Sequence, residues 1–95
     1  MAAISSNSYD YKAVETVPVI ASFDRSGRIS PLYVRLGRDS YKVQSCWASR
    51  KHGGIEEFHC RVVDGSCLKP LLLTYYKDED VWAVPGHALD PYRDR

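Results

Sequence analysis

The sequence lacks both a membrane-spanning segment and an export signal. No apolar stretch approaches the roughly 20 residues that a transmembrane helix needs. The opening Met-Ala-Ala-Ile-Ser-Ser-Asn-Ser has neither a basic start nor an apolar run, so it does not resemble a secretory signal. We therefore expect a soluble, cytoplasmic protein that has no membrane partner.

The chain contains only three cysteines. Cys46, Cys60 and Cys67 are an odd number, so they cannot all pair within one chain, and we expect reduced thiols. Together with His52 and His59 they are soft metal ligands within a span of 22 residues. No two of these residues have the Cys-x-x-Cys spacing of a structural zinc site, and adjacent strand residues point to opposite faces. The sequence predicts no metal and no cofactor.

Motifs for catalysis are also missing. The chain has no nucleophile elbow, no phosphate-binding loop and no paired-carboxylate motif. A catalytic cysteine or serine needs a positioned base beside it, and no spacing in the sequence provides one. The acidic run Asp78-Glu79-Asp80 lacks the alternating ligands of a calcium loop, which indicates a solvated turn. We expect a protein that is not an enzyme.

What the chain does contain is enough apolar surface for one small folded domain. Of its 95 residues, 44% are hydrophobic and 12% are aromatic. No segment shows helical periodicity over ten residues or more. Residues 1–13 are polar and without periodicity, and residues 87–95 carry Pro91 and alternating charges. We expect a flexible arm, a single β domain over residues 14–86, and a flexible tail.

Short runs of β-branched and aromatic residues, separated by turn residues, follow one another along this domain. Ile29–Leu36 and Tyr41–Trp47 alternate with period two, and the run 14–23 is interrupted by Pro18, which is typical of an edge strand. Further runs cover residues 55–63, 68–76 and 81–84. These five or six strands predict an all-β fold, a small antiparallel barrel or curved sheet, SH3-like as first choice and OB-like as second.

The same alternation predicts which side chains are buried. Strict period-two alternation over Tyr41–Trp47 places Val43 and Trp47 on the same face. We expect eight side chains to form the core: Val34, Val43, Trp47, Phe58, Val62, Leu71, Leu73 and Trp82.

The charge is unevenly distributed. The formal net charge is +1, yet nine lysines and arginines stand against four acids between Arg25 and Lys69. Basic residues beside tyrosines on a sheet are suited to binding single-stranded nucleic acid. The same residues are suited to a protein interface, where Trp, Tyr and Arg contribute most. They can also be the ordinary polar surface that any small sheet needs. Arg35, Lys42 and Arg61 are expected opposite Leu32, Val34 and Val43. The predicted partner-binding residues are Tyr33, Arg35, Arg38, Lys42, Arg61 and Tyr76.

Several blocks of the sequence resemble short uncharacterised bacterial all-β domains. The blocks are Pro31–Val43 with its Gly37-Arg38, the run Phe58–Val62, and the closing Asp80-Val-Trp82-Ala-Val84. The opening Val19–Leu32 resembles small proteins of Gram-positive bacteria and their mobile elements. The likeness spans roughly residues 17 to 85. It implies a small all-β fold and a bacterial or mobile-element source, and it implies no activity.

Three functions remain open at this point. We expect a non-enzymatic protein-binding domain, an adaptor or an inhibitor, and the resemblance implies a host defence or replication protein as its partner. The alternative is a small β-barrel that binds single-stranded nucleic acid. A second alternative is a structural homo-oligomer, such as a homodimer that forms through the edge strand around Pro18.

Overall fold

The structure, a computed structural model, describes residues 14–50 and 53–93. The predicted arm lies outside these residues. The described chain is all-β apart from one short 3-10 helix, and its strands pair antiparallel throughout. The elements are β1 (Val14–Val17), β2 (Val19–Phe23), β3 (Ile29–Leu36), β4 (Asp39–Arg50), β5 (Ile55–Asp64), β6 (Cys67–Tyr76), β7 (Val81–Pro85) and the 3-10 helix η1 (Gly86–Tyr92).

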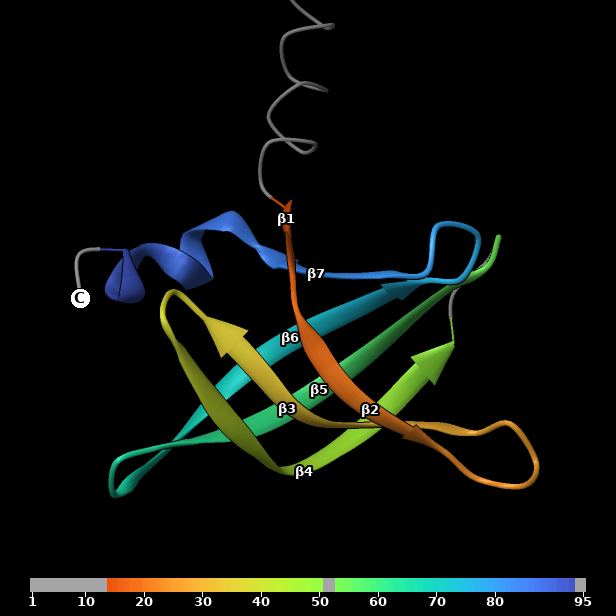
Figure 1. Ribbon diagram of the computed structural model, residues 1–95, viewed down its shortest axis with the longest axis horizontal. Coiled ribbons are helices and arrows are strands. Elements are labelled where there is room, and N and C mark those ends of the chain that lie inside the picture. The colour runs from red at the N-terminus through yellow and green to blue at the C-terminus, as the bar shows by residue number, and fades with distance from the viewer. Residues whose placement is uncertain (1–13, 51–52, 94–95) are drawn as a thin grey trace, which may run out of the picture.

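The strands form one strongly curled sheet. Their order is β1-β7-β6-β5-β4-β3-β2, so the first two strands of the chain lie at opposite ends of the order. Only Pro18 separates β1 from β2, and the two strands follow each other across the molecule in Figure 1. The Arg35 N–H donates to the Pro18 carbonyl oxygen at 3.0 Å. The sheet therefore curls until its two ends meet at Pro18, and the segment expected as one interrupted strand forms two.

A β-bulge in β4 reverses the faces of the residues that follow it. Val43 pairs with Val62, but Ser45 pairs with Arg61, so Gln44 is an extra residue on β4. β4 bends sharply in the middle of the strand, as Figure 1 shows. Because of the extra residue, Trp47 points outward and is 62% exposed. The prediction that Trp47 belongs to the core is therefore wrong.

A second bulge lies in β3. Ile20 pairs with Tyr33 while Ala21 pairs with Pro31, which leaves Leu32 as the extra residue. Pro31 and Val34 are buried, whereas Leu32 is 40% exposed and Tyr33 is 43% exposed. Leu32 therefore does not share the face of Val34, contrary to the alternation expected from the sequence.

The inner face of the curled sheet carries the core. Seven of the eight residues expected in the core are buried there, and Phe58, at 2% exposed, lies at its centre. The rings of Phe58 and Trp82 are 5.3 Å apart, and those of Tyr75 and Trp82 are 4.9 Å apart. Aromatic contacts of this kind add to the stabilisation that comes from burying their area.

The segment expected as the start of a flexible tail is packed against this core. Residues 86–92 form η1, which buries Leu89 and Tyr92. The Tyr92 hydroxyl donates to Asp64 Oδ2 at 3.1 Å, and its ring meets the Tyr41 ring edge-on at 5.2 Å. Pro91 is tolerated because a 3-10 turn makes few internal hydrogen bonds that it could break. The apolar contacts of Leu89 and Tyr92 hold this segment against the core, although its polar and charged composition indicated a flexible tail.

Candidate interaction surface

Most of the residues predicted to bind a partner meet on the outer face of the sheet. Tyr33 on β3 lies directly opposite Lys42 on β4, and Arg35 lies two residues along β3 on the same side. Arg61 on β5 is exposed between the buried Cys60 and Val62, so its side chain also points outward.

Two of the predicted residues lie apart from this group. Arg38 is exposed in the turn between β3 and β4. Tyr76 ends β6, pairs with Ile55 and Val81 on either side, and is half-buried.

Apolar side chains that the sequence analysis did not select share the outer face. Ile20, on the edge strand β2, pairs with Tyr33, so Ile20, Tyr33 and Lys42 form one row across three strands. Ile20 is 62% exposed. Cross-strand neighbours in such a row lie about 5 Å apart, which is close enough for one partner to cover all three.

Trp47 forms a second outward cluster, on β4 and β5. Its indole stacks on the His59 ring, with centroids 4.1 Å apart and planes inclined by 14°. His59 Nε2 lies 3.4 Å from the Ser49 hydroxyl, a weak contact that helps to orient the ring. No pattern in the sequence distinguishes this exposed tryptophan from a core residue, because the bulge at Gln44 has no signature of its own.

Three basic side chains on this face have no acidic partner among residues 14–50 and 53–93. Among the described residues, Arg35, Lys42 and Arg61 form no ion pair, whereas Lys69 pairs with Asp64 at 2.9 Å. Glu57, which lies beside His59 on the same face, already has an interaction of its own. The outer face therefore combines exposed aromatic rings with cations that are free to meet an acidic group.

The second half of β4 has a free backbone edge. β4 pairs with β3 only from Asp39 to Lys42, and from Val43 to Arg50 it pairs with β5 alone within the described chain. The first half of β3 turns away to pair with β2. A stretch of strand this long with one free side is a template on which another strand can pair.

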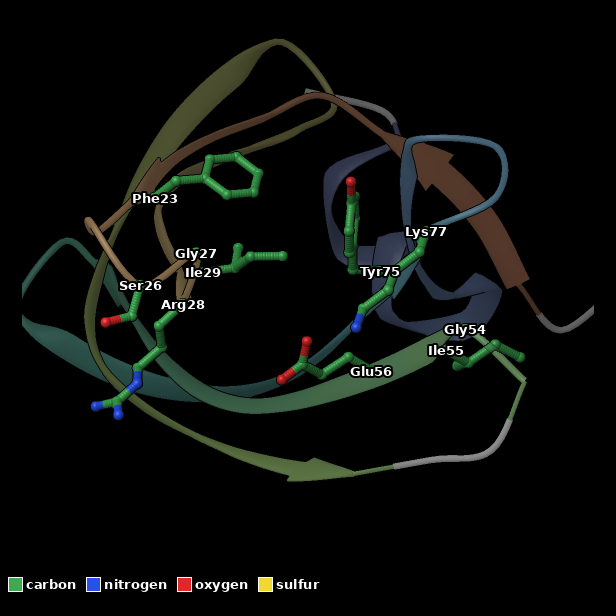
Figure 2. A pocket seen from close by; sticks show the side chains of 10 residues that line it. All are labelled: Phe23, Ser26, Gly27, Arg28, Ile29, Gly54, Ile55, Glu56, Tyr75 and Lys77. Atoms are coloured by element: carbon green, nitrogen blue, oxygen red, sulfur yellow. The ribbon is translucent and has the colours of Figure 1, made fainter.

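A cavity of about 690 Å³ opens at one end of the curled sheet. It lies between the β2–β3 hairpin and the ends of β5 and β6. Figure 2 shows Phe23, Ile29, Glu56 and Lys77 pointing toward its middle and Arg28 pointing away. Its volume is in the range of small-molecule sites, but it is wide open.

The hairpin beside this cavity is held by Asp24. The Asp24 carboxylate accepts the backbone N–H groups of Ser26 and Arg28, both at 2.8 Å. The hydrogen bond from Arg28 is the main reason that the pKa of Asp24 lies below its usual value.

The cysteines are all free thiols and differ in environment. Cys46 and Cys60 face each other across β4 and β5, and Cys67 is exposed. Burial, followed by the neighbouring Cys46, raises the pKa of Cys60 to about 12. Within residues 14–50 and 53–93, no three His, Cys, Asp or Glu side chains are grouped to hold a metal ion. His52, one of the soft ligands considered from the sequence, lies outside the described residues.

No helix in the described part of the chain is both long and apolar enough to cross a bilayer.

Comparisons with other proteins do not add a function to this surface. No protein-family model, no curated protein and no solved structure matches the chain.

Proposed function

We propose that this chain is a non-enzymatic protein-binding domain whose interface is the outer face of β2 to β5. One observation carries the proposal: Trp47 and Ile20 are each 62% exposed on a face that also presents Tyr33 and unpaired arginines. Trp, Tyr and Arg are the residues that contribute most to protein interfaces. Large apolar side chains gathered on one face of a small domain are typical of an interaction site.

The same proposal includes an architecture, a cellular setting and a class of partner. The curled antiparallel sheet supports an SH3-like architecture, and three free cysteines support a reducing, cytoplasmic setting. The resemblance to mobile-element proteins makes a host defence or replication protein the partner that we propose. A rigid domain of this size suits an adaptor or an inhibitor that covers a surface of its target.

Site-specific photo-crosslinking in the source cells tests the proposal. A photoreactive amino acid replaces Trp47 in one variant, Ile20 in a second and Val14 in a third. Val14 is the matched control because it is an apolar residue, 43% exposed, on β1. We expect the first two variants to crosslink to the same protein, and we expect the Val14 variant not to crosslink to it.

The other outcomes separate the remaining functions. Crosslinks to a second copy of this chain through position 20 indicate a homo-oligomer, since β2 ends the strand order and pairs only with β3 among the described strands. The absence of any protein crosslink at positions 20 and 47 contradicts the proposal.

Single-stranded nucleic acid is the second candidate, and the unpaired cations favour it. Arg35, Lys42 and Arg61 lie on one face with Tyr33, on which a base can stack. If three phosphates are neutralised, the logarithm of affinity falls with the logarithm of salt concentration with a slope of about −2. Replacing the three cations with alanine flattens that slope. Oligonucleotide binding measured at two salt concentrations checks this, and the lack of binding at low salt eliminates the candidate.

A further inference from the structure

The free edge of β4 offers a backbone docking site. From Val43 to Arg50 this strand is paired on the β5 side only, within the residues that the structure describes. Every second backbone N–H and C=O along such an edge points away from the sheet and needs a partner or water. The stretch contains no proline, which is the residue that most directly blocks strand addition.

Other edges of the sheet are less suited to a partner strand. β6 is unpaired on the β7 side before Thr74, but Pro70 interrupts that edge, and His87 and Ala88 of η1 lie near it. β2 is only five residues long and follows Pro18 directly. Beyond the bulge at Gln44, residues 45–50 of β4 are therefore the longest regular free edge in the described sheet.

The side chains that border the β4 edge differ between its two faces. On the inner face the residues are Cys46 and Ala48, whose neighbours across β5 are the buried Cys60 and Phe58. Both border residues are small, which leaves room for larger apolar side chains beside the core. The outer face carries Trp47, Arg61 opposite Ser45, and Lys42 before the bulge, and neither cation forms an ion pair within the described residues.

We infer that the β4 edge binds an extended segment of a partner protein, in which apolar residues alternate with acidic residues. The segment adds a strand beside Val43–Arg50. Its apolar side chains point inward, next to Cys46 and Ala48. Its acidic side chains point outward, toward Lys42 and Arg61, and its backbone runs beside Trp47. The inference rests on the proposed function and gives that function a mode of recognition, strand addition.

A peptide selection tests the inference without knowledge of the natural partner. A library of random 12-residue peptides is selected on the full chain, and the enriched peptides are synthesised. We expect period-two sequences of apolar and acidic residues. Hydrogen exchange should slow at backbone amides between Ser45 and Ser49. Trp47→Ala should weaken binding about 30-fold, the lower limit for a hot spot, and Leu68→Ala, at an exposed apolar residue on β6, should leave affinity unchanged.

N-methylation of the peptide backbone distinguishes strand addition from other modes. Two peptides are made with methyl groups on alternate backbone nitrogens, and the methylated positions of the second are shifted by one residue. In one phase the methyl groups remove the N–H donors that face β4, and in the other they remove those that face solvent. We expect one phase to abolish binding and the other to leave it intact. Tolerance of both phases, or protection of β2 in place of β4, overturns the inference and leaves the protein-binding function standing.

Two further results separate the inference from the proposed function. If no peptide is enriched while photo-crosslinking through Trp47 captures a protein, the inference is wrong and the function stands. If no peptide is enriched, no protein is crosslinked, and a thymidine oligonucleotide quenches the Trp47 fluorescence, both are wrong. Trp82→Phe leaves Trp47 as the only tryptophan for that measurement.

Discussion

Phe58 is the side chain around which the inner face closes. It is 2% exposed and contacts Trp82 at a ring separation of 5.3 Å. Phe58→Ala removes this contact and leaves a cavity, so we expect the free energy of unfolding to fall by about 3–5 kcal/mol. Denaturant unfolding measures the change.

The matched control for Phe58 is the exposed Trp47. Its indole stacks on His59 and reaches no part of the core, so Trp47→Ala should lower the free energy of unfolding by no more than about 1.5 kcal/mol. Equal losses for the two substitutions would mean that Trp47 is buried, as the alternation pattern had indicated.

Cys60 gives a prediction about pH. Burial raises the pKa of its thiol to about 12 from an ordinary value of 9.0, so between these pH values the folded state binds more protons than the unfolded state. Stability is therefore unaffected by this thiol below about pH 9 and decreases as the pH rises toward 12. We expect Cys60→Ala to flatten that decrease when the free energy of unfolding is measured from pH 8 to pH 11.

Thiol reactivity provides an independent check on the same residue. At pH 8 the exposed Cys67 should react at once with a disulfide reagent, whereas Cys60 should react only when the chain unfolds. Rapid labelling of all three thiols in the folded protein would contradict the buried position of Cys60.

At the scale of elements, η1 packs closely against the β3–β4 turn at Gly37. Gly37 has φ +69°, and a Cβ at this position would lie 2.6 Å from the Tyr92 carbonyl oxygen. Gly37→Ala therefore combines left-handed strain with a clash against backbone, and we expect a loss of about 2–4 kcal/mol.

Gly27 isolates the contribution of the backbone conformation. It has φ +83° with nothing within 4 Å of an added Cβ, so Gly27→Ala should lower the free energy of unfolding by only about 1 kcal/mol. The difference between the two variants, measured by thermal unfolding, reports how firmly η1 is packed. Equal losses of stability in Gly37→Ala and Gly27→Ala would show that η1 moves away from the turn at no cost in free energy.

The elements themselves were largely predictable from the sequence. Period-two alternation and turn residues located β3 to β7 closely, since alternation reports a half-buried strand wherever pairing is regular. The face of each residue was predictable only up to a bulge, and Trp47 lies beyond one. The packing of η1 was not predictable, because it depends on a distant turn at Gly37 and on Asp64. Of the candidate site, the cations were found and the exposed Trp47 was missed.

At the scale of the whole molecule, the bulge at Gln44 sets the curvature of the sheet. Deleting Gln44 would remove the bulge and leave Ser45, Cys46 and Trp47 on their present faces, because each keeps its partner on β5. We expect the deletion to keep a cooperative unfolding transition but to lower its midpoint, because a regular strand bends less between its pairing with β3 and its pairing with β5. Circular dichroism during thermal unfolding measures this. Gln44→Ala, which keeps the extra residue, should change stability by less than about 1 kcal/mol.

The pairing of β1 with β7 has a consequence for the order in which the chain is made. Val14 pairs with Pro85 and Val17 with Trp82, so β1 leaves the ribosome well before the strand with which it pairs. Contacts this distant in sequence form late and slow the folding of a domain. Until residue 85 emerges, β1 has no partner strand and the Trp82 ring is missing from beside Phe58 and Tyr75. A nascent chain stalled before Val81 should remain sensitive to protease, and one that has released residue 92 should be resistant.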